Sequence, residues 1–260
     1  NGFKVYWKDG GQIVPPIENL LISEIEKLKF KEVNFNSRPK LIEIIDKEID
    51  KPFIDICLEN AINKDVKNRD DIKIIFTALH GTSSTIIPTL LKKAGYKNVS
   101  YVKSQMITDG NFSTVKSPNP EDIESLDLAL KLGVKEKADI VIGTDPDADR
   151  LGIAIRDLKN NLTLINGNQL MVLIFNYILD KKKSEKTLRK NHFLASTIVS
   201  TPMIKNIANY YKVDIKLSLT GFKWIAKMIE DFPDQKFLVG GEESFGLMIG
   251  DAVRDKDALT

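Results

Sequence analysis

Three aspartates alternate along a short segment that directly follows an apolar run. Asp145, Asp147 and Asp149 occupy every second position after residues 139–143, and Pro146 restricts the backbone between the first two. In a loop that curves past a strand end, alternate side chains can turn toward one point, where three carboxylates repel one another unless a cation lies between them. Hard carboxylate oxygens favour magnesium, calcium or manganese. This aspartate loop (residues 145–149) therefore predicts a divalent-cation site.

Arg150 ends the pattern and adds positive charge, which a simple cation site does not need. It fits if an anion such as a phosphate lies between the metal and the guanidinium. An EF-hand calcium loop also begins with spaced aspartates, but here its sixth position is Arg150 instead of glycine and its twelfth is Arg156 instead of glutamate. A solvated acidic turn without a ligand is the other alternative.

A second polar turn follows the apolar residues 237–240 and is bounded by glycines. Its Glu242, Glu243 and Ser244 offer two carboxylates and a hydroxyl, which can hydrogen-bond to neighbouring hydroxyls of a sugar. A solvated turn is the alternative for this glutamate loop (residues 242–246). His80 stands at a strand-to-helix junction, where free amides can face an anion, although a lone histidine is more often structural.

Composition narrows the class of protein. The chain has 260 residues, of which 38 are basic and 36 acidic, and no stretch forms a basic stripe, so neither nucleic acid nor a membrane surface is expected as a partner. No apolar run approaches the ~18 residues of a membrane span. The single cysteine, Cys57, cannot form a disulfide framework and fits a reducing, cytoplasmic setting.

Strand and helix patterns alternate along most of the chain. Short β-branched runs predict strands at 3–7, 72–77, 99–102, 139–143, 151–155, 193–198, 213–217 and 236–239. Apolar residues at helical spacing predict helices at 17–33, 38–64, 85–94, 121–132 (closed by Gly133), 167–181, 202–211 and 221–230. We therefore expect two successive α/β/α domains with mixed, largely parallel sheets, divided at the polar residues 158–161, with ligands beyond the carboxyl ends of strands.

At these motifs the sequence resembles the α-D-phosphohexomutase superfamily of phosphoglucomutases and phosphomannomutases, and most of all the branch that includes phosphopentomutases. Six segments carry the resemblance in one order: residues 1–7, 78–82, 143–150, 220–223, 240–246 and 254–257. The resemblance implies the tail of a first domain at 1–17, a second, metal-loop domain at 18–158 and a third, sugar-recognition domain at 159–260. It also implies that a Ser-His-Asn-Pro loop precedes the chain and a phosphate-binding domain follows it, so that the chain alone is inactive.

The resemblance further implies the reaction. A phosphate moves between the 1-position and the 6- or 5-hydroxyl of a hexose or pentose phosphate, through a phosphoserine and a bisphosphate, with one Mg²⁺ per site and a glucose 1,6-bisphosphate-type activator. Asp145, Asp147 and Asp149 would bind the metal. The catalytic residues would be Lys4, Arg150 and Lys256, and the substrate-binding residues Glu242, Glu243, Ser244, Thr220, Gly221 and His80.

Several of these roles have plain alternatives. Lys4 alternates outward on its predicted strand, as a surface lysine would, and Lys256 lies in a charged turn. Thr220 and Gly221 can be a helix cap and a turn. For the whole protein, two other functions are open: a metal-dependent module that binds a sugar phosphate without turnover, and a phosphatase with Asp145 as its nucleophile. The preferred sugar and the oligomeric state are not predicted.

Overall fold

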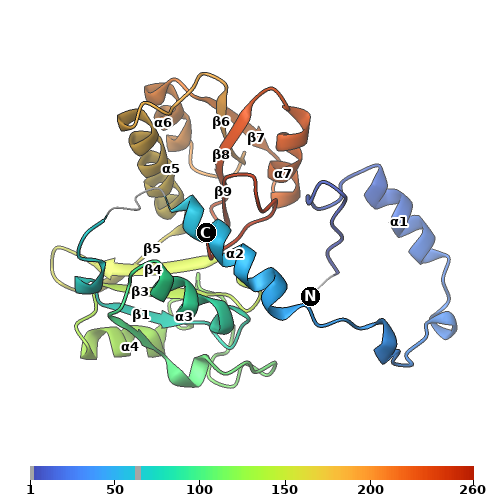
Figure 1. Cartoon of the computed structure of the whole chain (residues 1–260), viewed down its shortest axis with the longest axis horizontal. Coiled ribbons are helices and arrows are strands. Elements are labelled where there is room, and N and C mark those ends of the chain that lie inside the picture. Colours follow the sequence, from blue (N-terminus) through green and yellow to red (C-terminus); the bar gives the residue numbers. More distant parts are fainter. Residues whose placement is uncertain (1–2, 62–65) are drawn as a thin grey trace.

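The strands of this protein form two sheets, which Figure 1 shows in a computed structural model that describes residues 3–61 and 66–260. The first sheet has the order β2-β1-β3-β4-β5 and the second the order β7-β6-β8-β9. The strands of the first sheet are β1 (Ile74–Thr77), β2 (Val99–Tyr101), β3 (Ile140–Thr144), β4 (Leu151–Arg156) and β5 (Leu162–Ile165). Those of the second are β6 (His192–Thr197), β7 (Asp214–Ser218), β8 (Lys236–Gly241) and β9 (Leu247–Ile249).

Parallel pairing forms the centre of both sheets. β1 pairs in parallel with β2 and β3, and β6 pairs in parallel with β7 and β8. The antiparallel strands β4, β5 and β9 extend one edge of each sheet. The prediction of mixed, largely parallel sheets is confirmed.

Helices cover both faces of the first sheet. Phe76 packs with Ile87 of α3 (Ser83–Lys93) and with Ile54 of α2 (Asp46–Asn60). The next side chain along β1, Ile75, points the other way and packs with Ala129 of α4 (Asp127–Lys135). This alternation follows from the pleat of a strand and produces the predicted α/β/α layers.

The second sheet repeats the arrangement. Leu194 packs with residues of α5 (Gly167–Ser184) and α6 (Met203–Tyr211), whereas its neighbour Phe193 packs with α7 (Phe222–Asp231). Within the described residues, no helix combines the length and the apolar composition that crossing a bilayer requires.

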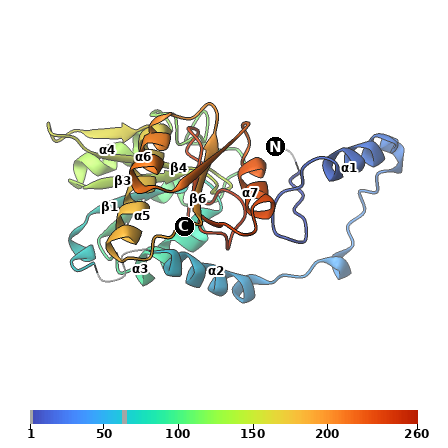
Figure 2. The same ribbon diagram turned by 90° about the horizontal axis from the view of Figure 1, so that it is seen from above.

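The amino-terminal predictions were partly wrong. The predicted strand at 3–7 is reduced to one bridge between Tyr6 and Gln12, and the helix predicted at 17–33 ends early as α1 (Ile17–Glu26). Among the described residues of the helix predicted at 38–64, only α2 (Asp46–Asn60) is α-helical. Residues 62–64 of that prediction and residues 1–2 of the predicted first segment lie outside the described part. Figures 1 and 2 show α1 extending away from both sheets, and none of its residues is buried among the part of the chain that the structure describes.

The helix end predicted at Gly133 was wrong because packing overrode the local pattern. Gly133 does not close a helix but lies inside α4, where an added Cβ would come within 2.8 Å of Val141. The polar residues 158–161 form a hairpin turn, in which the Asp157 carboxylate accepts hydrogen bonds from two backbone N–H groups. β5 beyond this turn still pairs with the first sheet, and neither it nor β9 was predicted.

Replacing Phe175 tests the core of the second sheet. The side chain of Phe175 on α5 is fully buried, so Phe175→Ala is expected to lower the free energy of unfolding by about 3–5 kcal/mol. Leu173 on the same helix is 55% exposed, and Leu173→Ala should change it by less than about 0.5 kcal/mol. Urea unfolding followed by tryptophan fluorescence, to which Trp224 on α7 contributes, measures the stability of both variants. Equal unfolding midpoints for Phe175→Ala and Leu173→Ala would contradict this core assignment.

Candidate active site

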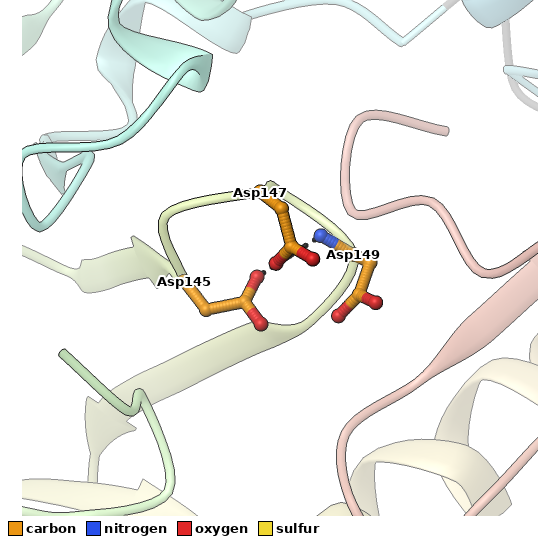
Figure 3. Close-up of side chains that lie close together, drawn as sticks. All are labelled: Asp145, Asp147 and Asp149. Carbon is orange, nitrogen blue, oxygen red and sulfur yellow. Dashed lines mark hydrogen bonds between the residues drawn. The ribbon is translucent and has the colours of Figure 1, made fainter. Parts of the chain in front are cut away.

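The three aspartates gather at the carboxyl end of β3. One carboxylate oxygen from each of Asp145, Asp147 and Asp149 lies within 4.8 Å of the others. Figure 3 shows Asp145 and Asp147 extending toward each other across the loop, with Asp149 beside them. Ala148 adopts a left-handed φ of 59°, which tightens the turn between the last two aspartates. The predicted convergence of the carboxylates is thus present.

Asp145 is the buried anchor of the loop. Its Oδ1 accepts hydrogen bonds from the backbone N–H groups of Asp149 (3.0 Å) and Arg150 (2.9 Å), and its Oδ2 accepts one from Arg150 Nε (2.7 Å). Burial raises the pKa of Asp145 to about 6, although the hydrogen bonds from Arg150 oppose the rise. These bonds hold the loop in shape.

Two lysines from opposite ends of the chain converge on Asp149. Its Oδ2 lies 3.2 Å from Lys4 Nζ and 3.0 Å from Lys256 Nζ. Burial alone would raise the pKa of Asp149, but the ammonium of Lys256 and the hydrogen bond from Lys4 outweigh it and hold the pKa below its usual range. Asp255, 3.9 Å from Lys4, also accepts a hydrogen bond from Tyr6.

The donor set fits a hard divalent cation. Three carboxylates within one ion's reach are the ligands that magnesium, calcium and manganese prefer. Asp147 is exposed and makes no hydrogen bond or ion pair with the described residues, so its oxygens are free to bind an ion.

The glutamate loop follows β8 in the second sheet. The Glu242 side chain is buried, and its Oε1 accepts a hydrogen bond from the backbone N–H of Gly221 (2.9 Å). Burial raises the pKa of Glu242. Glu243 faces elsewhere, because its Oε2 accepts hydrogen bonds from the hydroxyls of Ser200 (2.9 Å) and Thr197 (3.4 Å).

The other residues predicted to bind substrate differ in exposure. Ser244 is half-buried and Thr220 is exposed, next to Gly221 with its φ of 112° before α7. The Gly221 N–H is the group that contacts Glu242. The structure therefore links the segment at 220–221 to the glutamate loop through the backbone of Gly221.

Backbone contacts join the two loops. Arg150 forms an antiparallel bridge with Gly246, and the N–H of Leu151 donates to the carbonyl of Phe245 (3.3 Å). An added Cβ on Gly246 would come within 2.9 Å of the Lys256 side chain, so the glycine leaves room for that lysine. The aspartate and glutamate loops, about 95 residues apart in sequence, thus belong to one site.

Two cavities flank the aspartates. One, of about 580 Å³, is lined by Thr82 and Ser83 at the start of α3 and by Arg254. The other, of about 670 Å³, is lined by Arg150 and Asn119. Both are also lined by Lys4, Asp147, Asp149 and Lys256. A ligand in either cavity would meet the acidic cluster together with cations.

His80 lies apart from the cluster. Its ring nitrogens contact the Ile107 carbonyl (2.9 Å) and the Thr114 hydroxyl (2.8 Å), and the side chain is buried. Its φ of 66° and the approach of Gly81 to Pro146, where an added Cβ would be 2.4 Å away, shape the loop against which the aspartates pack. The structure places His80 as a support of this loop and brings neither ring nitrogen to the aspartates.

Sequence reasoning missed other residues of the site. Asn119 and Glu121 each lie 3.2 Å from Arg150 Nη1, and Ser83 hydrogen-bonds to Thr144 beside the first aspartate (2.6 Å). The only local signal was two prolines flanking Asn119, which predict a stiff loop but say nothing of its partner.

Family comparisons match both halves of the chain. Residues 51–159 match the model of phosphoglucomutase/phosphomannomutase α/β/α domain II, and residues 166–260 match that of domain III. Together the two matches cover more than three quarters of the chain.

Individual relatives agree. Phosphoglucomutases from Staphylococcus epidermidis and Staphylococcus aureus are each 38% identical over 271 aligned residues, which cover 100% of this chain and 47% of the relative. The chain thus spans about half the length of these relatives. A phosphoglucomutase/phosphomannomutase family structure from Burkholderia thailandensis has a TM-score of 0.60 at 19% identity, covering 79% of this chain and 41% of that one.

The fold also matches parafusin, a phosphoglucomutase from Paramecium, with a TM-score of 0.58 at 18% identity over 80% of this chain and 35% of that one. At these identities the structural matches support the fold alone, whereas the domain models and the relatives support family membership from the sequence. With its aspartate loop joined to its glutamate loop, the chain belongs to the phosphoglucomutase/phosphomannomutase family.

Proposed function

We propose that this chain supplies the metal-binding and sugar-binding domains of a cytoplasmic phosphosugar mutase that converts a hexose or pentose 1-phosphate to the 6- or 5-phosphate. The observation that carries the proposal is the acidic cluster of Asp145, Asp147 and Asp149, surrounded by cationic side chains and joined through backbone to a loop with a buried glutamate. Cations around a carboxylate cluster suit a substrate that brings its own negative charge.

The aspartates would hold one Mg²⁺, which supplies charge neutralisation for phosphoryl transfer. Arg150, Lys4 and Lys256 extend positive charge around the cluster, where each can donate to phosphoryl oxygens. Lys4, which shares Asp149 with Lys256, would also act as the general acid or base. The chain contains no Ser-His-Asn-Pro sequence, so the phosphoserine would belong to a segment outside these 260 residues.

Sugar recognition is assigned to the glutamate loop. Glu242 and Ser244 would bind sugar hydroxyls, with Thr220 and Gly221 beside them, and Glu243 would contribute if it leaves Ser200. A bisphosphate of the substrate sugar, such as glucose 1,6-bisphosphate, would prime the phosphoserine. Because the chain spans about half of its relatives, the isolated chain is expected to bind a metal and a sugar phosphate without turnover.

Metal binding can be tested on the chain itself. Asp147→Asn removes one carboxylate that has no partner among residues 3–61 and 66–260, so the fold should be unchanged while the Kd for Mg²⁺ rises by about tenfold or more. Isothermal titration calorimetry with MgCl₂ measures the Kd. Asp234→Asn, at an exposed turn, is the matched control. Equal Mg²⁺ affinities of the wild type, Asp147→Asn and Asp234→Asn would show that Asp147 is not a metal ligand.

Turnover is tested on the full product of the gene that encodes this chain. With Mg²⁺ it should isomerise at least one of the 1-phosphates of glucose, mannose, glucosamine and ribose, and Asp147→Ala should lower kcat/KM by about 10²-fold or more. Unchanged activity in this variant would exclude the assigned role. Phosphate release without isomerisation, with a covalent phosphate on Asp145, would instead favour the phosphatase.

The role of Glu242 is tested with a substitution of the same shape. Glu242→Gln keeps an acceptor for the Gly221 N–H but removes the charge, so KM for the sugar phosphate should rise about tenfold to a hundredfold, as expected for losing a hydrogen bond to a charged group. Glu243→Gln serves as the comparison, because that carboxylate faces Ser200. A larger rise in KM for Glu243→Gln would reverse the assignment.

A further inference from the structure

Arg150 is held from two sides. Its Nε donates to Asp145 Oδ2 (2.7 Å), and its Nη1 donates to Asn119 Oδ1 and Glu121 Oε1, each at 3.2 Å. Asp145 comes from the aspartate loop, whereas Asn119 and Glu121 come from the segment at 117–121, about 30 residues earlier. A guanidinium is planar, so fixing Nε and Nη1 also fixes the direction of Nη2.

The Nη2 edge is the part left for a ligand. Arginine has five N–H groups, and the three contacts use the one on Nε and the two on Nη1. Among the described residues, Nη2 donates no hydrogen bond. Arg150 lines the cavity of about 670 Å³ together with Asp147, Lys4 and Lys256, where an anion would meet several cations.

The segment at 117–121 is itself rigidly placed. The Ser125 hydroxyl donates to the Ser117 carbonyl (2.6 Å), and the Asn119 side chain accepts from the backbone N–H of Glu121 (3.2 Å). On β4, Gly152 packs so closely that an added Cβ would lie 2.6 Å from the carbonyl oxygen of Pro120. A segment anchored in this way can hold a flexible arginine side chain in one orientation.

We propose that Asn119 and Glu121 are positioning residues that orient the Arg150 guanidinium so that its Nη2 edge binds the phosphoryl group of the sugar phosphate. This inference rests on the proposed mutase function. Glu121 also prevents the guanidinium from turning fully onto the aspartates: Arg150 Nε already lies 3.7 Å from Asp149 Oδ1. An arginine drawn onto Asp149 would compete with Lys4 and Lys256 and leave the cavity without its fork-shaped donor.

The orientation is tested on the 260-residue chain by ¹⁵N NMR of arginine side chains, which measures rotation of the guanidinium about its Nε–Cζ bond. Rotation at Arg150 should be slow in the wild type, at least about tenfold faster in Glu121→Ala and intermediate in Glu121→Gln, which keeps an acceptor. Glu124→Ala, an exposed glutamate of the same region, should leave it unchanged. Equal rotation in Glu121→Ala and the wild type would overturn the proposal.

The consequence for the reaction is tested on the full gene product. Glu121→Ala should lower kcat/KM for the sugar phosphate by about 10–100-fold, Glu121→Gln should restore part of it, and the Kd for Mg²⁺ should stay within about threefold, because Glu121 is not a metal ligand. Faster rotation of the Arg150 guanidinium in Glu121→Ala with unchanged kcat/KM would refute the positioning role but leave the mutase proposal intact. An inactive wild type would refute the mutase proposal, while the NMR result would still decide whether Glu121 holds Arg150.

Discussion

Mutual repulsion among three carboxylates at one strand end is the constraint around which this site is built. Asp145 is stabilised by backbone N–H groups and Arg150, and Asp149 by two ammonium groups, whereas Asp147 has no such partner among the described residues. The negative charges of the three carboxylates are therefore compensated unevenly, and the carboxylate of Asp147 remains exposed and without a partner among the described residues. Such a carboxylate suits a cation that arrives with, or before, a negatively charged substrate.

The compensating charges come from remote parts of the chain. Lys4 and Lys256 lie near opposite ends of the sequence, yet both lie within 3.2 Å of the same carboxylate oxygen. The carboxy-terminal segment is held there by backbone hydrogen bonds from Ala258 to Ala148 (3.0 Å) and from Asp257 to Leu247 (2.9 Å). The first sheet thus supplies the carboxylates, and the segment after the second sheet supplies the cation Lys256, so the site depends on how the two sheets are joined.

Close approach of backbone segments also positions the loops. Gly167 at the start of α5 lies so close to the glutamate loop that an added Cβ would be 1.9 Å from the Glu243 carbonyl oxygen, and Gly81 lies similarly against Pro146 of the aspartate loop. Neither glycine has a positive φ, so space and not conformation requires them. Loops packed in this way keep their functional groups in place without a long hydrogen-bond network.

The sequence by itself determined most strands and helices, the mixed sheets and the convergence of the aspartates, because periodicity and the position of a loop after a strand are local properties. It did not predict β5 or β9, whose pairing depends on distant partners, and it placed Gly133 at a helix end although packing put it inside α4. Only the tertiary structure decided that Glu121 holds Arg150 and that His80 turns away from the aspartates. These contacts join segments that approach only when the chain folds, so no local pattern encodes them.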